Sequence, residues 1–139
     1  MANALYPSAK AALLQGAINL LTADVRAALL KTSAYNAADA FMADIAADVI
    51  ARSTSLTGKT VDEETATFDS DDALFASVPS GPDDVAVVVL FIHTGNDATA
   101  RLLGFFDTGL TGVPLTPDGR DIRVMVDDDE YGVPGWFQL

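Results

Sequence analysis

The chain has 139 residues, of which half are hydrophobic and a fifth are charged, and it contains no cysteine. This length suits one domain with a single core, and the missing cysteines exclude disulfides, zinc–thiolate sites and thiolate catalysis. The net charge is −12, with a net +1 on residues 1–60 and −13 on residues 61–139, so we expect no binding to nucleic acid or to an anionic membrane, which need clustered Lys and Arg.

The first third of the chain is rich in alanine and predicts short helices. Residues 7–21 begin with a proline and continue with Ala, Leu and Lys, which predicts a helix of about two or three turns that ends near Gly16. Residues 23–35 suit a helix by composition and a strand by alternation, and both assignments stay open. Residues 36–50 predict a further short helix that is capped by Asn36.

After residue 49 the pattern is that of short strands separated by turns that contain Gly and Pro. Residues 59–69 alternate in the manner of a strand. The run VAVVVLFI at 85–92 is too short to cross a membrane as a helix and favours a central strand that is buried on both faces. Residues 85–94 and 98–107 predict a hairpin, and the final WFQL predicts a short last strand.

Strands that recur about every ten residues between such turns are typical of antiparallel β folds. We therefore predict one mainly β domain over residues 1–139, built as an antiparallel β-sandwich or barrel. One or two short N-terminal helices are expected, with helical elements confined to about residues 7–50.

The stretch PDGRDIRVMVDDDE at 117–130 is dense in charged side chains and resembles a calcium loop. An EF-hand loop requires its glycine at the sixth position, whereas Gly119 comes near the beginning and arginines occupy ligand positions. We interpret the stretch as a turn, a half-buried strand at 122–127 and a solvated acidic end. A calcium site of another kind, at 127–130 or at the DSDD of 69–72, stays open as an alternative.

Patterns for catalysis are weak. His93 is the only histidine, which excludes a site with several histidine ligands, and its position after an apolar run predicts a core or strand-end role. TGKT at 57–60 lacks the preceding glycine of a phosphate loop. A carbohydrate site would need a carboxylate pair beside aromatic side chains, for which the sequence offers Tyr131 and Trp136. We expect no enzyme activity, no metal and no cofactor.

Both ends of the chain are apolar, with MANALY at the start and WFQL at the finish. Terminal residues are commonly polar and frayed, so apolar ends have two explanations: they pack on their own domain, or they dock on a neighbouring molecule.

Four segments resemble a group of small virion proteins of tailed bacteriophages. They are MANALYPSAKAALLQGAINLLTADVRAALL, STSLTGKTV, TARLLGFFDTGLTGVPLTPDGRDIRVMVDD and the terminal FQL. The resemblance covers most of the chain. It implies a structural component of a phage particle with a β-sandwich-like fold and no enzyme activity, and it implies a strand at 24–31.

For a small structural protein of a virion, the simplest role is that of a capsid decoration (cement) protein. Such a protein is located on the capsid surface, where it binds the outer face of the head and links neighbouring copies of the major capsid protein. We expect the chain to self-associate as a small symmetric oligomer, with its near-neutral N-terminal part toward the shell. The expected contacts to neighbouring subunits are Leu5, Tyr6, Trp136, Phe137 and Leu139. A tail-associated or host-contacting virion protein is the alternative, followed by a calcium- or carbohydrate-binding module.

Overall fold

The computed structural model describes residues 4–32, 34–107, 110–111, 115–126 and 136–138. Its largest sheet has five antiparallel strands. In spatial order they are β1 (Ala4–Leu5), β8 (Leu102–Phe106), β7 (Val87–Ile92), β2 (Val25–Leu30) and β3 (Val49–Arg52).

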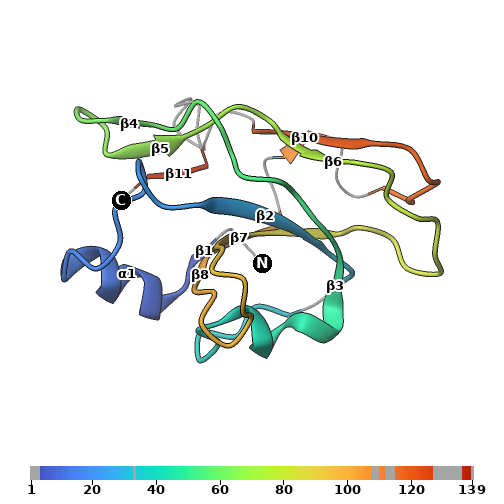
Figure 1. The fold of residues 1–139 in the computed structure, drawn as a ribbon, viewed down its shortest axis with the longest axis horizontal. Coiled ribbons are helices and arrows are strands. Elements are labelled where there is room, and N and C mark those ends of the chain that lie inside the picture. Colours follow the sequence, from blue (N-terminus) through green and yellow to red (C-terminus); the bar gives the residue numbers. More distant parts are fainter. Residues whose placement is uncertain (1–3, 33, 108–109, 112–114, 127–135, 139) are drawn as a thin grey trace.

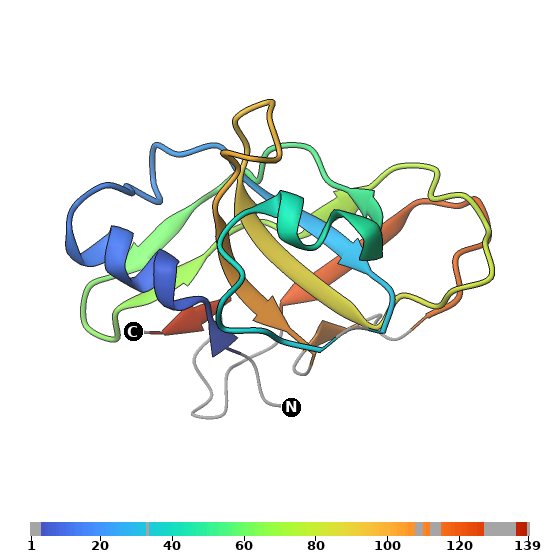
Figure 2. The same cartoon turned by 90° about the horizontal axis from the view of Figure 1, so that it is seen from below.

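Two smaller antiparallel sheets have three strands each. One contains β6 (Ala73–Phe75), β10 (Ile122–Val126) and β9 (Leu110–Thr111), and the other contains β11 (Phe137–Gln138), β5 (Thr67–Asp69) and β4 (Thr60–Asp62). Both lie on one side of the five-stranded sheet, and two 3₁₀ helices, η1 (Met42–Asp44) and η2 (Ala46–Asp48), lie on the other (Figures 1 and 2). The prediction of a mainly β, antiparallel fold with a short N-terminal helix is confirmed; closure as a sandwich or barrel stays a prediction.

Strand β7 is the centre of the large sheet, as its apolar sequence predicts. It pairs with β2 along one edge and with β8 along the other, and five of its six residues are buried. The predicted hairpin is therefore confirmed. Its loop is longer than predicted, because β8 begins only at Leu102 and residues 93–101 belong to neither strand.

One hydrophobic core joins the three sheets. Phe106 of β8 contacts the ring of Trp136, with the ring centroids 5.6 Å apart, and Phe68 of β5 contacts Phe137 at 5.5 Å. These ring contacts continue the core from the large sheet to the end of the chain. The largest fully buried side chains are Tyr6, Phe68, Phe75, Phe91, Leu29, Leu30, Met42, Leu90, Leu102, Leu103, Val25 and Val78.

The N-terminal helix, α1, covers Pro7–Leu14 and ends where the sequence predicts. Gly16 has a φ of +72°. Its N–H donates to the carbonyl of Leu13 at 3.2 Å, and the N–H of Ala17 donates to the carbonyl of Ala12 at 2.8 Å. This pair of bonds is the Schellman motif, in which a glycine takes the left-handed position that terminates the helix.

Residues 25–30 form a strand although alanine and leucine favour a helix. Strand β2 is hydrogen-bonded on both edges, to β3 and to β7, and all of its residues except Arg26 are buried. Pairing on both edges outweighs helix propensity, which differs by less than about 1 kcal/mol between ordinary residues. The strand implied by the family resemblance is correct here, and the helical reading of residues 23–35 is wrong.

The single helix predicted for residues 36–50 is also wrong, since the segment forms η1 and η2 instead. The Asp44 carboxylate accepts the N–H groups of Ala40 and Phe41 at 2.9 and 3.0 Å. Asn36 does act as a cap, but only of a local turn, through a 3.0 Å bond from the N–H of Ala38. Side-chain bonds of this kind compete with α-helical backbone bonds and favour short turns.

Strand β10 confirms the half-buried strand predicted within 117–130. Ile122 and Val124 are buried and Arg123 is exposed. The preceding turn includes Gly119, whose φ is +89°. Residues 127–130, for which we predicted a solvated acidic end, lie outside the described residues.

The alternating stretch at 59–69 forms two strands joined by a turn, instead of one strand. The Asp62 carboxylate accepts the N–H groups of Glu64 and Thr65 at 2.9 and 3.2 Å, which bends the chain between β4 and β5. The turn ends at Ala66, whose φ is +55°. A non-glycine residue in this left-handed region is strained by about 1–2 kcal/mol.

Replacing Ala66 with glycine is expected to raise the free energy of unfolding by roughly 0.5–1 kcal/mol. The relief of left-handed strain exceeds the roughly 0.5–1 kcal/mol that glycine loses in chain entropy. Urea unfolding followed by circular dichroism measures the change. Ala51→Gly in β3 is the matched control, because Ala51 has no positive φ and should lose stability; a loss for both variants would contradict the prediction.

Candidate interaction surface

The inner side of α1 fixes the helix to the large sheet. Tyr6, Ala9 and Ala12 are buried, and the N–H of Tyr6 donates to the carbonyl of Leu103 at 3.0 Å. The small alanine side chains allow the helix backbone to lie close to β8. This side accounts for only part of the apolar surface of the helix.

The outer side of α1 is also largely apolar and is exposed. Pro7, Lys10, Ala11 and Leu14 follow the i, i+3, i+4, i+7 spacing of one helix face, and all four are exposed. Leu14 is 89% exposed. A helix that is apolar on both sides is normally buried on both sides, so the outer side has the composition of a contact surface.

The turn after α1 exposes a second leucine. The Asn19 side-chain carbonyl accepts the N–H of Leu21 at 3.1 Å, and the Asn19 backbone carbonyl accepts the N–H of Ala23 at 2.9 Å. This turn directs Leu20 into the core and leaves Leu21 51% exposed. We call Pro7, Lys10, Ala11, Leu14 and Leu21 the α1 surface; the segment that carries it lies at one end of the molecule (blue in Figures 1 and 2).

The α1 surface comes from the longest stretch of the chain without a carboxylate. The first acidic residue is Asp24, and Lys10 is the only charged side chain before it, although the chain contains 20 Asp and Glu in all. Leu14 and Leu21 are not among the contacts predicted from the sequence. The sequence signal that could have indicated them as contacts is an apolar segment, with a second apolar helix face at Leu14, that contains no acidic residue.

The predicted contact residues at the chain ends are largely packed on their own domain. Tyr6 and Trp136 are buried, while Leu5 and Phe137 are half-buried. Leu139 lies outside the described residues. The positions of Tyr6 and Trp136 favour self-packing, and contact of these five residues with neighbouring subunits stays a prediction.

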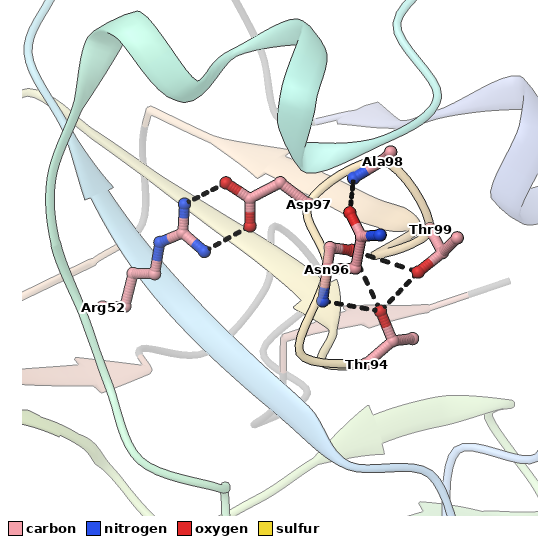
Figure 3. A network of polar contacts seen from close by, with 6 residues as sticks. All are labelled: Arg52, Thr94, Asn96, Asp97, Ala98 and Thr99. Carbon is pink, nitrogen blue, oxygen red and sulfur yellow. Dashed lines mark hydrogen bonds and ion pairs between the residues drawn. The ribbon is translucent and has the colours of Figure 1, made fainter.

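A cluster of polar side chains, separate from the α1 surface, lies at the loop between β7 and β8 (Figure 3). The two guanidinium N–H groups of Arg52 donate to the Asp97 carboxylate at 2.6 and 2.8 Å. The carbonyl of Asp97 accepts the N–H of Ala43 at 3.1 Å. Within the loop, Thr94 contacts Thr99 at 2.6 Å, and Asn96 accepts the N–H of Ala98 at 2.9 Å. The cluster therefore clamps the loop to β3 and η1.

This clamp perturbs the titration of both partners. The hydrogen bonds from Arg52 hold the pKa of Asp97 below its usual range, and the same bonds raise the pKa of Arg52. The directions agree, as expected for a paired arginine and carboxylate. His93, directly after β7, is half-buried, which fits the strand-end role predicted for it.

Replacing Asp97 with asparagine is expected to cost about 0.5–1 kcal/mol of stability at neutral pH, a value limited by the partial exposure of the pair. The lowered pKa means that the bond stabilises the fold above the ordinary pKa and loses this effect as the pH falls through the lowered value. Wild type and variant should therefore converge in acid. Urea unfolding at several pH values tests this, with Asp118→Asn, from the exposed pair with Arg120, as the control that should change little.

The alternatives of calcium and carbohydrate binding gain no support from the geometry. In the part of the chain that the structure describes, no group of three or more His, Asp or Glu side chains is placed to hold a metal ion. Within 69–72, the Asp71 carboxylate accepts the Thr57 hydroxyl at 2.9 Å. Trp136 is buried and offers no open ring for a sugar, while Tyr131 lies outside the described residues. No helix in the described ranges is long and apolar enough to cross a membrane.

Comparison with protein-family models, with curated proteins and with solved structures finds no match for this chain. The α1 surface is the structural observation that bears on function.

Proposed function

We propose that this protein is a virion structural protein of a tailed bacteriophage, and specifically a capsid decoration (cement) protein on the outer surface of the head. The resemblance in MANALY, STSLTGKTV and the segment from 99 to 128 supports a virion protein. The observation that carries the structural role is the exposed apolar side of α1. In an acidic chain, an exposed apolar helix side is a surface for protein contact.

The mechanism is mechanical rather than chemical. Packaged DNA pushes the shell outward, and a protein that bridges neighbouring copies of the major capsid protein resists the separation of those copies. A rigid domain suits this role, and here the hydrophobic core joins all three sheets while the Arg52–Asp97 clamp holds the long β7–β8 loop. The acidic remainder of the chain stays in solvent, where like charges discourage unspecific association.

Partners in this proposal are the major capsid protein and further copies of the chain in a small symmetric oligomer. Symmetry follows from the shell, because identical subunits present identical junctions, and closed point-group assemblies are the rule for homo-oligomers.

The test is reconstitution on heads that lack the protein. Purified protein is added to such heads and, separately, to isolated tails, and both samples are imaged by electron cryo-microscopy. Regular density on the outer surface of the heads is expected, together with a higher temperature of shell disruption. Bare heads with density on the tails would replace decoration by the tail-associated role, and bare heads and tails would contradict the proposal.

A further inference from the structure

We infer that a second copy of this chain docks on the α1 surface, so that two copies pair through the outer sides of their α1 helices about a two-fold axis. The inference rests on the self-association in the proposed function and does not depend on shell binding. It names the surface used for self-association, which differs from the contacts predicted at the chain ends.

Charge selects the α1 surface for contact between identical copies. Two chains that each carry −12 repel one another, and contact is favourable only where carboxylates do not oppose carboxylates. The other large exposed hydrophobic side chains among the described residues are Val61 and Leu74. Val61 is followed directly by Asp62, Glu63 and Glu64, and Leu74 follows the acidic DSDD segment, whereas the α1 surface comes from a stretch without acid.

The shape of the outer side also suits pairing with itself. The exposed stripe runs Pro7, Lys10, Ala11, Leu14, with the small Ala11 at its centre. An antiparallel pair with the axis near Ala11 brings the two backbones close and sets each Leu14 toward the opposite helix start, at the interaxial distance of about 8–10 Å usual for packed helices. Lys10 covers the edge with its aliphatic stem and keeps its charge in water.

An eight-residue helix and one turn bury less than the roughly 1,600 Å² of a standard stable interface. The pair should therefore dissociate on dilution and be favoured where copies are concentrated. Added salt should strengthen it, because salt screens the repulsion between the acidic chains while the contact itself is apolar.

The experiment is sedimentation velocity of the purified full chain over a concentration series at low and high salt. We expect a monomer–dimer equilibrium with more dimer at high salt. Leu14→Gln with Leu21→Gln should weaken association at least about tenfold, equivalent to about 1.4 kcal/mol. The matched control is Val61→Gln with Leu74→Gln, two side chains that are 43% and 44% exposed, and it should leave the dimer unchanged.

Because Leu14 and Leu21 are exposed, the double variant should keep the wild-type circular dichroism and melting temperature, and the single Leu14→Gln variant serves if it does not. A monomer under all conditions, equal weakening by both variant pairs, or dissociation by salt would each overturn the inference. A monomer that still decorates heads would overturn the α1 pairing and leave decoration intact. A dimer that leaves heads bare would do the reverse.

Discussion

Replacing Trp136 with alanine is expected to lower the free energy of unfolding by about 3–5 kcal/mol, the usual cost of truncating a buried large aromatic side chain. The Trp136 side chain is 4% exposed, and its ring packs on Phe106 with the centroids 5.6 Å apart. Its indole N–H donates to the Ser70 hydroxyl at 2.8 Å, and its backbone N–H donates to the carbonyl of Phe68 at 2.7 Å. Truncation removes the ring and the indole bond together.

Urea unfolding followed by far-ultraviolet circular dichroism measures this change without relying on tryptophan fluorescence. Trp136→Phe is the control, because it keeps most of the ring volume and loses the indole bond, for an expected cost of about 1–2 kcal/mol. Phe137→Ala gives a second comparison, since that side chain is only half-buried. If Trp136→Ala cost no more than Phe137→Ala, the ring would not belong to the core, and its docking on a neighbour would be favoured.

Replacing Tyr6 with alanine should destabilise the fold to a similar degree, by about 3 kcal/mol or more. Tyr6 is 1% exposed and packs on Tyr35, with the ring centroids 5.2 Å apart. It also precedes α1 directly, so the loss of its ring frees the helix from β8. Thermal and urea unfolding measure the loss, and a folded, fully stable Tyr6→Ala variant would contradict this account.

The control Tyr6→Phe keeps the ring and tests the hydroxyl by pH. Burial raises the pKa of Tyr6 above its ordinary value of 10.0, with a further contribution from Asp39. The raised pKa means that the neutral hydroxyl is compatible with the fold at neutral pH, and that stability is lost as the pH rises above 10.0. Wild type should therefore lose more stability than Tyr6→Phe in alkali, and parallel curves would argue against the burial.

The parts of the fold that the sequence predicts are those governed by local rules. Gly16 ends α1 because a left-handed residue terminates a helix, and β7 is central because a short apolar run is buried on both faces. The alternation of Ile122 and Val124 with Arg123 likewise reports a half-buried strand. Each of these signals is contained within a few neighbouring residues.

The parts that sequence reasoning missed or left open depend on distant partners. Composition and alternation left residues 23–35 open between helix and strand, and residues 25–30 are a strand because β3 and β7 pair with both edges. The turn between β4 and β5 depends on Asp62, whose side chain replaces the turn glycine that the sequence lacks.

The same limit applies to the candidate site. An apolar chain end packs on its own domain only if other parts of the chain provide contacts for it. For Trp136 these contacts come from Phe106 and Ser70, which are distant in sequence. Leu14 and Leu21 look like ordinary core leucines until the fold shows that Ala9 and Ala12 occupy the side toward the sheet. Exposure is decided by tertiary structure, and pattern alone does not reveal it.

The strands β1 and β11 each pair with a strand that is distant in sequence, and this affects how quickly the chain reaches its native state. Ala4 lies opposite Phe105 in the large sheet, and Phe68 lies opposite Phe137 in a small one. Contacts between such distant residues form late, so folding should take roughly milliseconds to seconds instead of microseconds. Until β2 and β8 flank it, the apolar β7 is bare, and refolding at high concentration will compete with aggregation.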